Sequence, residues 1–163
     1  MEASGTGNMK FALNGALTMG TLDGANVEIR EEVGPENIFI FGTRAEEVES
    51  LRARRAYDPV AHYERSAVIR RVVDAFDSGV FSPDEPGRFG LIVGNLTGPD
   101  YFLVCSDFTD YWRASREVDT AVRDRAGWTR MALLNTARSG WFSSDRTIRG
   151  YMADIWHAEP VAP

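Results

Sequence analysis

The chain has 163 residues, 44% of them hydrophobic, and a net charge of −6 at pH 7. This composition is typical of a globular protein, and it excludes the basic surface of a nucleic-acid-binding protein and the polybasic patch of a membrane-surface protein. No apolar run is long enough to span a membrane and no signal peptide is visible, so we expect a cytoplasmic protein. The single cysteine, Cys105, excludes an intrachain disulfide and is expected to be a small buried hydrophobic residue. No metal site is predicted.

The N-terminal third is expected to alternate between helices and strands. After a glycine-rich loop, the pattern predicts a helix over 8–16, a short strand over 17–21 and a helix over 25–32. The continuous apolar run 38–41 is typical of a buried strand in a parallel sheet. Thr43 is expected to cap the helix that follows, whose first turn carries acidic residues.

The middle of the chain is predicted to be mostly helical. A helical pattern extends from Asp58-Pro59 to about Asp77, and a loop rich in proline and glycine follows at 82–87. The run 89–96 fits either a helix or a strand. The apolar run 101–104 is interpreted as another short buried strand.

The C-terminal third predicts three helices. A long helix is expected to begin at Asp107, a second covers 128–138, and Ser143 or Ser144 caps the last one. With many helices and few strands, the chain is interpreted as part of an α/β domain.

Lys10 is the strongest candidate for a functional residue in the sequence. It is the only lysine among 18 basic residues, although arginine serves wherever else a cation is needed. A desolvated lysine amine can attack a carbonyl group to form a Schiff base, which arginine cannot do. The preceding run Ser4-Gly5-Thr6-Gly7 provides backbone N–H groups at a helix N-terminus, where phosphate binds readily. A phosphate site next to a reactive amine indicates pyridoxal phosphate.

The glycine run departs from two known phosphate-binding motifs and also fits a simpler structure. A P-loop requires Ser or Thr after its lysine, but Phe11 follows Lys10, and the dinucleotide-binding fingerprint requires a third glycine where Lys10 stands. The residues also fit an ordinary turn before a helix, with Lys10 as a solvated surface lysine. Local chemistry leaves this last alternative open.

A family resemblance favours the cofactor site. Residues 2–29, EASGTGNMKFALNGALTMGTLDGANVEI, closely resemble the cofactor-lysine signature of the α-glucan phosphorylases, the glycogen, starch and maltodextrin phosphorylase family. The C-terminal region is similar to the same family at Trp128-Thr129-Arg130-Met131, Ser139-Gly140, 142–148 and Ile155-Trp156. The resemblance therefore covers essentially the whole chain.

The resemblance implies an α/β fold, specifically the C-terminal part of a Rossmann-like lobe in a two-lobe glycosyltransferase of the GT-B type. On this interpretation, residues 1–163 are the C-terminal portion of the cofactor-binding lobe, which is helix-rich and has an incomplete parallel sheet. The N-terminal lobe is expected to be absent from the chain. A homodimer is implied for the full-length family member.

The resemblance also implies an activity and a role for each residue of the motif. The family uses inorganic phosphate to release glucose 1-phosphate from α-1,4-glucan, and the 5′-phosphate of pyridoxal phosphate exchanges a proton with the substrate phosphate. Lys10 would be the catalytic residue that holds the cofactor. The cofactor phosphate would be bound by Thr6 and Gly7. The hydroxyl groups of the glucose unit would be bound by Glu2, Ser4 and Gly5.

We expect the isolated chain to be inactive, because the arginine and the second lysine that the family uses for phosphate lie upstream. One alternative is a non-catalytic fragment that docks on a complementary lobe. Another is a pyridoxal phosphate enzyme with different chemistry, such as aminotransfer.

Overall fold

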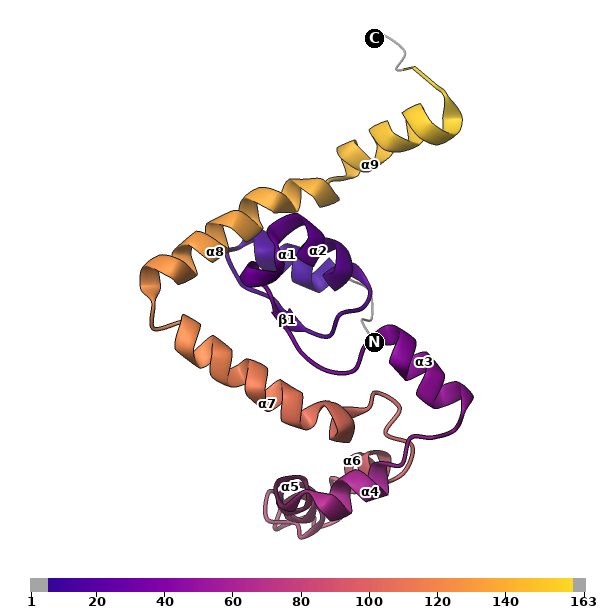
Figure 1. Ribbon diagram of the computed structural model, residues 1–163. Coiled ribbons are helices and arrows are strands. Elements are labelled where there is room, and N and C mark those ends of the chain that lie inside the picture. The colour runs from indigo at the N-terminus through magenta and orange to yellow at the C-terminus, as the bar shows by residue number, and fades with distance from the viewer. Residues whose placement is uncertain (1–5, 160–163) are drawn as a thin grey trace. The chain divides into compact units, whose positions relative to one another are not determined.

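The computed structural model describes residues 6–159 and shows a helix-rich α/β chain (Figure 1). The elements follow in the order α1 (Thr6–Leu13), β1 (Met19–Gly20), α2 (Ala25–Val33), η1 (Pro35–Asn37), β2 (Phe39–Ile40), α3 (Ala45–Ala53), α4 (Pro59–Arg65), α5 (Ala67–Asp77), α6 (Gly90–Thr97), α7 (Val104–Ala121), α8 (Arg125–Arg138), η2 (Ser139–Phe142), α9 (Ser144–Tyr151) and η3 (Met152–Trp156).

Two compact units divide the described residues. Unit 1 comprises 20–23 and 40–116, and unit 2 comprises 6–19, 24–39 and 117–159. No helix among residues 6–159 is both long enough and apolar enough to span a membrane.

The strands β1 and β2 form a small two-stranded parallel sheet. The backbone N–H of Phe39 donates to the carbonyl of Thr18 at 3.0 Å, and that of Phe41 donates to Gly20 at 3.1 Å. Both predicted strands are confirmed, in shorter form, and the α/β class with a small parallel sheet is confirmed with them.

In unit 2, the helices α1, α2 and α8 pack together (Figure 1). Ala12, Ile29 and Val33 are buried between them, at 3–5% exposure. The helix α1 ends at a glycine: Gly15 has φ +80°, its N–H donates to Ala12, and the N–H of Ala16 donates to Phe11. This is the Schellman arrangement, and it explains why α1 ends earlier than the expected residue 16.

In unit 1, α4, α5 and α6 enclose a small core of Ile69, Val73 and Cys105. Cys105 is 4% exposed, as predicted. Burial raises the pKa of its thiol to about 11, so the thiol stays neutral. The run 89–96, which the sequence left open between helix and strand, is the helix α6.

Two expected secondary-structure elements of unit 1 differ from the structure. The run 101–104 is a turn rather than a strand, with Tyr101 51% and Phe102 55% exposed, and α7 already begins at Val104. The helical pattern at 58–77 is two helices, because Ser66 has extended backbone angles and its hydroxyl accepts the N–H of Ile69 to cap α5.

Candidate functional site

The helix α1 places three of the predicted site residues on one face. Thr6 and Lys10 are four residues apart and Gly7 and Lys10 are three apart, so the three positions follow one another along the same side of the helix. Lys10 is exposed. Because a helix rises by about 1.5 Å per residue, Lys10 lies about one turn from the first backbone N–H groups. Among the described residues, α1 begins at Thr6, two residues before the expected start at residue 8. The exposure of Lys10 agrees with an accessible amine and equally with the alternative of a solvated surface lysine.

The space beside Gly7 is open. A Cβ atom built at Gly7 would meet nothing within 4 Å among the described residues, so the first turn of α1 is accessible on that side. An anion can therefore approach the first turn of α1 on that side. The predicted sugar-binding residues Glu2, Ser4 and Gly5 lie outside the described residues, and their role stays a prediction.

Two hydrogen bonds fasten α1 to the rest of unit 2. The amide of Asn8 donates to the Oδ1 atom of Asn26 on α2 at 2.8 Å. The hydroxyl of Thr136 on α8 donates to the carbonyl oxygen of Ala12 at 2.8 Å. The helix that carries Lys10 is thus held near both of its ends, and nothing in the local sequence pattern of α1 indicated either partner.

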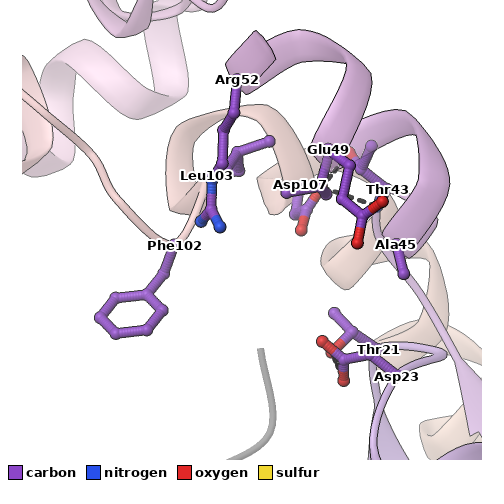
Figure 2. Close-up of a pocket in the computed structure, with 10 residues that line it drawn as sticks. Thr21, Asp23, Thr43, Ala45, Glu49, Arg52, Phe102, Leu103 and Asp107 are labelled. Atoms are coloured by element: carbon purple, nitrogen blue, oxygen red, sulfur yellow. Dashed lines mark hydrogen bonds between the residues drawn. The ribbon is translucent and has the colours of Figure 1, made fainter.

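Unit 1 also contains a hollow of about 210 Å³ that was not predicted from the sequence (Figure 2). Residues that directly follow the two strands contribute to it, together with α3 and α7: Thr21, Asp23, Thr43, Glu49, Arg52 and Asp107. In open α/β sheets, ligands bind outside the carboxyl ends of the strands. Polar residues immediately after each predicted strand were the signal that could have identified this position.

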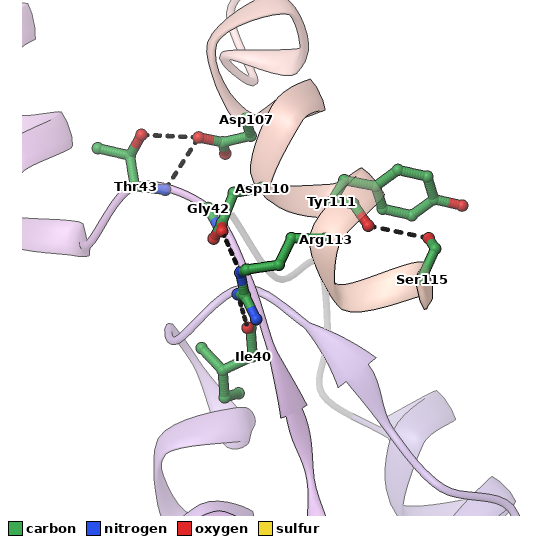
Figure 3. Close-up of polar contacts among 8 residues, drawn as sticks. All are labelled: Ile40, Gly42, Thr43, Asp107, Asp110, Tyr111, Arg113 and Ser115. Atoms are coloured by element: carbon green, nitrogen blue, oxygen red, sulfur yellow. Dashed lines mark hydrogen bonds and ion pairs between the residues drawn. The ribbon is translucent and has the colours of Figure 1, made fainter. Parts of the chain in front are cut away.

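The loop after β2 is held by polar side chains of α7 (Figure 3). Asp107 accepts both the N–H and the hydroxyl of Thr43, at 2.9 and 2.6 Å. Asp110 accepts the N–H of Gly42 at 2.7 Å. The Thr43 hydroxyl is therefore committed to Asp107, and the prediction that Thr43 caps α3 is wrong: the N-cap residue is Arg44, which makes no side-chain cap.

Arg113 completes this network. Its Nε atom donates to Asp110 at 2.6 Å and its guanidinium also donates to the carbonyl oxygen of Ile40 at 2.9 Å. The hydrogen bond from Arg113, with that from the Gly42 N–H, holds the pKa of the Asp110 carboxyl below its usual value. The carboxylate form is thus favoured in the folded chain.

Asp110 should make stability depend on pH. A carboxyl whose pKa is depressed by folding adds stability above its unfolded pKa of about 3.9, and this contribution is lost as pH falls through the folded pKa. The free energy of unfolding of Asp110→Asn should therefore lie below that of the original chain at pH 6, and the gap should narrow below about pH 4. Urea denaturation of both chains at several pH values from 3 to 7 measures this difference in the free energy of unfolding. A gap independent of pH would contradict this role.

Gly42 should be difficult to replace. Its φ is +84°, and an added Cβ would lie 2.7 Å from Oδ2 of Asp107 and 3.0 Å from Cγ2 of Thr21. Gly42→Ala is expected to lower the free energy of unfolding by about 2 kcal/mol, through backbone strain and the displaced carboxylate. The control is Gly87→Ala, where a Cβ meets nothing within 4 Å and the change should stay within about 0.5 kcal/mol. Equal losses in urea denaturation would refute the argument.

Within residues 6–159, no group of three or more histidine, cysteine or acidic side chains is placed to hold a metal ion.

Comparison with known proteins shows the family to which this chain belongs. Residues 1–158 match the carbohydrate phosphorylase family. The glycogen phosphorylase of Synechocystis sp. is 52% identical over 160 residues, which are 98% of this chain and 19% of that protein. The brain form of glycogen phosphorylase from Bos taurus is 52% identical over 161 residues, which are 99% of this chain and 19% of that protein. The muscle form of glycogen phosphorylase from Homo sapiens is 50% identical over 159 residues, which are 98% of this chain and 19% of that protein.

This chain therefore spans 19% of the length of these relatives, and their similarity extends over nearly all of it. The glycine-rich run 4–7, the helix α1 and the single lysine all lie within the matched residues. The chain belongs to the carbohydrate phosphorylase family.

Proposed function

We propose that this chain forms the cofactor-binding part of a glycogen phosphorylase, which uses inorganic phosphate to release glucose 1-phosphate from the ends of α-1,4-glucan. The observation that carries the proposal is the identity of about one half with relatives named glycogen phosphorylase, across nearly the whole chain. The arrangement of Thr6, Gly7 and Lys10 on one face of α1 is consistent with that activity.

The residues present fit pyridoxal 5′-phosphate. The open first turn of α1 beside Gly7 suits the cofactor phosphate, and the exposed amine of Lys10 on the same face suits its aldehyde. Thr6 and the backbone N–H of Gly7 would bind the phosphate, and the positive end of the α1 dipole would favour its charge. Gly7 has no side chain to obstruct this approach.

Lys10 would fix the position of the cofactor through its amine, one turn away from the phosphate. When bound, the cofactor supplies a phosphate group with a second pKa of about 6, which can exchange a proton with the substrate phosphate near neutral pH. The work of this chain is to hold that phosphate at the first turn of α1. Holding the cofactor at both its phosphate and its aldehyde matters, because misplacing reacting groups by about 1 Å can lower the rate a hundredfold.

Glu2, Ser4 and Gly5 are proposed to bind the hydroxyl groups of the terminal glucose. They precede Thr6 directly in the sequence, at most four residues from it. Their polar groups can therefore reach a sugar that sits next to the cofactor phosphate. Hydrogen bonds to the sugar would orient the bond that is cleaved.

The longer protein is proposed to have the two-lobe GT-B architecture and to form a homodimer in the cytoplasm. Residues 1–163 would then belong to the C-terminal lobe. Large apolar side chains that remain exposed in this chain support docking against further protein, as with Phe11 at 68%, Leu13 at 58% and Leu91 at 91% exposure. The same observation favours the second candidate function, a non-catalytic fragment that docks on a complementary lobe.

Complementation tests both candidates. This chain would be co-expressed with the upstream part of the Synechocystis enzyme that it does not match, and the product assayed with glycogen, inorganic phosphate and pyridoxal phosphate. We expect glucose 1-phosphate from the pair and none from either part alone. Association of the two parts without any glucose 1-phosphate would favour the docking fragment. Activity of this chain alone would contradict the proposal that part of the active site lies in the upstream part of the protein. Amino-acid donors in the same assay test aminotransfer, and we expect no turnover.

A further inference from the structure

Asn26 is a buried polar residue that directly contacts the helix carrying Lys10. It lies in the first turn of α2 and is only 3% exposed. Its Oδ1 atom accepts a hydrogen bond of 2.8 Å from the Nδ2 atom of Asn8. A buried amide is costly unless its hydrogen bonds are made, so this contact is a specific one.

The direction of this hydrogen bond is fixed by a second contact of Asn8. The Oδ1 atom of Asn8 accepts the backbone N–H of Met9 at 2.9 Å. The Nδ2 group of Asn8 must therefore face Asn26, and Asn26 must present its oxygen. Turning either amide round would place two donors or two acceptors against each other.

Asn8 lies directly between the parts of the proposed cofactor site. It follows Gly7, whose N–H is proposed to bind phosphate, and precedes Lys10 by two residues. The helix α1 has only eight residues, and a helix so short is marginal without tertiary contacts. The opposite end is held by the hydrogen bond from Thr136 to Ala12, and the hydrogen bond between Asn8 and Asn26 holds the first turn.

We propose that Asn26 is a positioning residue for Lys10: through Asn8, it fixes the first turn of α1, and with it the distance between the phosphate-binding N–H groups and the lysine amine. This inference rests on the proposed function. Asn26 itself does not touch the cofactor in this account. Its effect is to make one short helix rigid enough to bind the phosphate and the aldehyde of one molecule together.

Three variants of the chain test the proposal. Asn26→Leu removes the acceptor at nearly unchanged volume, and Asn26→Asp retains an acceptor oxygen for Asn8. Asn37→Leu is the matched control, because Asn37 is also a buried asparagine of unit 2, at 7% exposure, and its amide donates to Val33 rather than to α1. Urea denaturation verifies that the two leucine variants are folded and comparably destabilised.

The first measurement is hydrogen exchange of the backbone amides in α1. In Asn26→Leu, the amides of residues 10–12, which donate within α1, should exchange about tenfold faster than in Asn37→Leu, the change expected when one buried hydrogen bond is lost. Asn26→Asp should recover most of the protection. Equal exchange in the two leucine variants would overturn the proposal.

The second measurement compares how fast pyridoxal phosphate and pyridoxal label Lys10 under borohydride. The ratio of the two rates reports whether phosphate binding and the amine act together, and a merely structural residue would not change it. We expect a preference for pyridoxal phosphate that falls about tenfold in Asn26→Leu, returns in Asn26→Asp and persists in Asn37→Leu. A preference unchanged in Asn26→Leu overturns the positioning role alone. No preference in the original chain overturns the proposed cofactor function, and the positioning role with it.

Discussion

A Lys10→Arg variant is expected to abolish glucose 1-phosphate formation by the complemented enzyme. Arginine keeps the positive charge and much of the side-chain length, but its guanidinium stays protonated and cannot bond to the cofactor aldehyde. The rate should fall by at least about a thousandfold, which corresponds to ~4 kcal/mol of transition-state stabilisation. Initial rates with glycogen and inorganic phosphate, at saturating pyridoxal phosphate, measure the loss.

The control for this substitution is Arg65→Lys, the reverse exchange at the end of α4, where Arg65 is exposed. Its rate should remain within about twofold of the original, since a surface cation is being exchanged for another. If Lys10→Arg retained more than about a tenth of the original rate, Lys10 would not be the residue that holds the cofactor.

An Asp100→Ala variant is expected to destabilise unit 1 by about 3 kcal/mol. Asp100 is 3% exposed, and its carboxylate accepts the backbone N–H groups of Val104 and Cys105, both at 2.9 Å, at the start of α7. It also accepts the hydroxyl of Tyr57. Burial and the contact with Asp100 raise the pKa of this phenol, so it remains a donor. Alanine would leave three donors without an acceptor.

The matched control is Asp58→Ala. Asp58 also caps a helix, but it is exposed, and within residues 6–159 it accepts a single N–H, from Ala61 at 3.2 Å. Its loss should cost about 1 kcal/mol, as usual for a single helix cap. Urea denaturation of both variants measures the difference. Similar losses would mean that water replaces the Asp100 contacts, and the buried network would then not stabilise the start of α7.

The elements that the sequence predicted correctly are those set by local pattern. The apolar run 38–41 gave β2, the glycine turn before residue 25 gave α2, and Ser143 caps α9 by accepting the N–H of Arg146. Each of these depends on residues within a few positions of one another. Lys10 could be singled out for a similar reason, because its neighbours along α1 are also its neighbours in sequence.

The errors have a common cause in contacts between distant residues. Thr43 was expected to cap α3, but Asp107, 64 positions later, takes both its N–H and its hydroxyl. The run 101–104 has a strand-like composition, but Asp100 and Leu103 adopt positive φ angles of 31° and 56° that end the preceding segment in a turn. No local pattern reports a partner so far away.

The same limit applies to the candidate site. The sequence predicted Thr6 and Gly7 in a loop before a helix that starts at residue 8. The structure instead has Thr6, Gly7 and Lys10 within α1, and helical geometry then gives them a common face. The contact between Asn8 and Asn26 spans 18 positions and two helices. The Thr136 hydroxyl reaches Ala12 over 124 positions. Residues that position the lysine therefore required the structure, whereas the lysine itself did not.

The most direct test of the account is to find which amine of this chain binds pyridoxal phosphate. The purified chain would be incubated with the cofactor, reduced with borohydride and sequenced as peptides; its only primary amines are Lys10 and the N-terminus. We predict a label on Lys10 that saturates at low cofactor concentration and is reduced by inorganic phosphate, which competes for the first turn of α1. A label confined to the N-terminal amine would contradict the proposal that α1 forms the cofactor site.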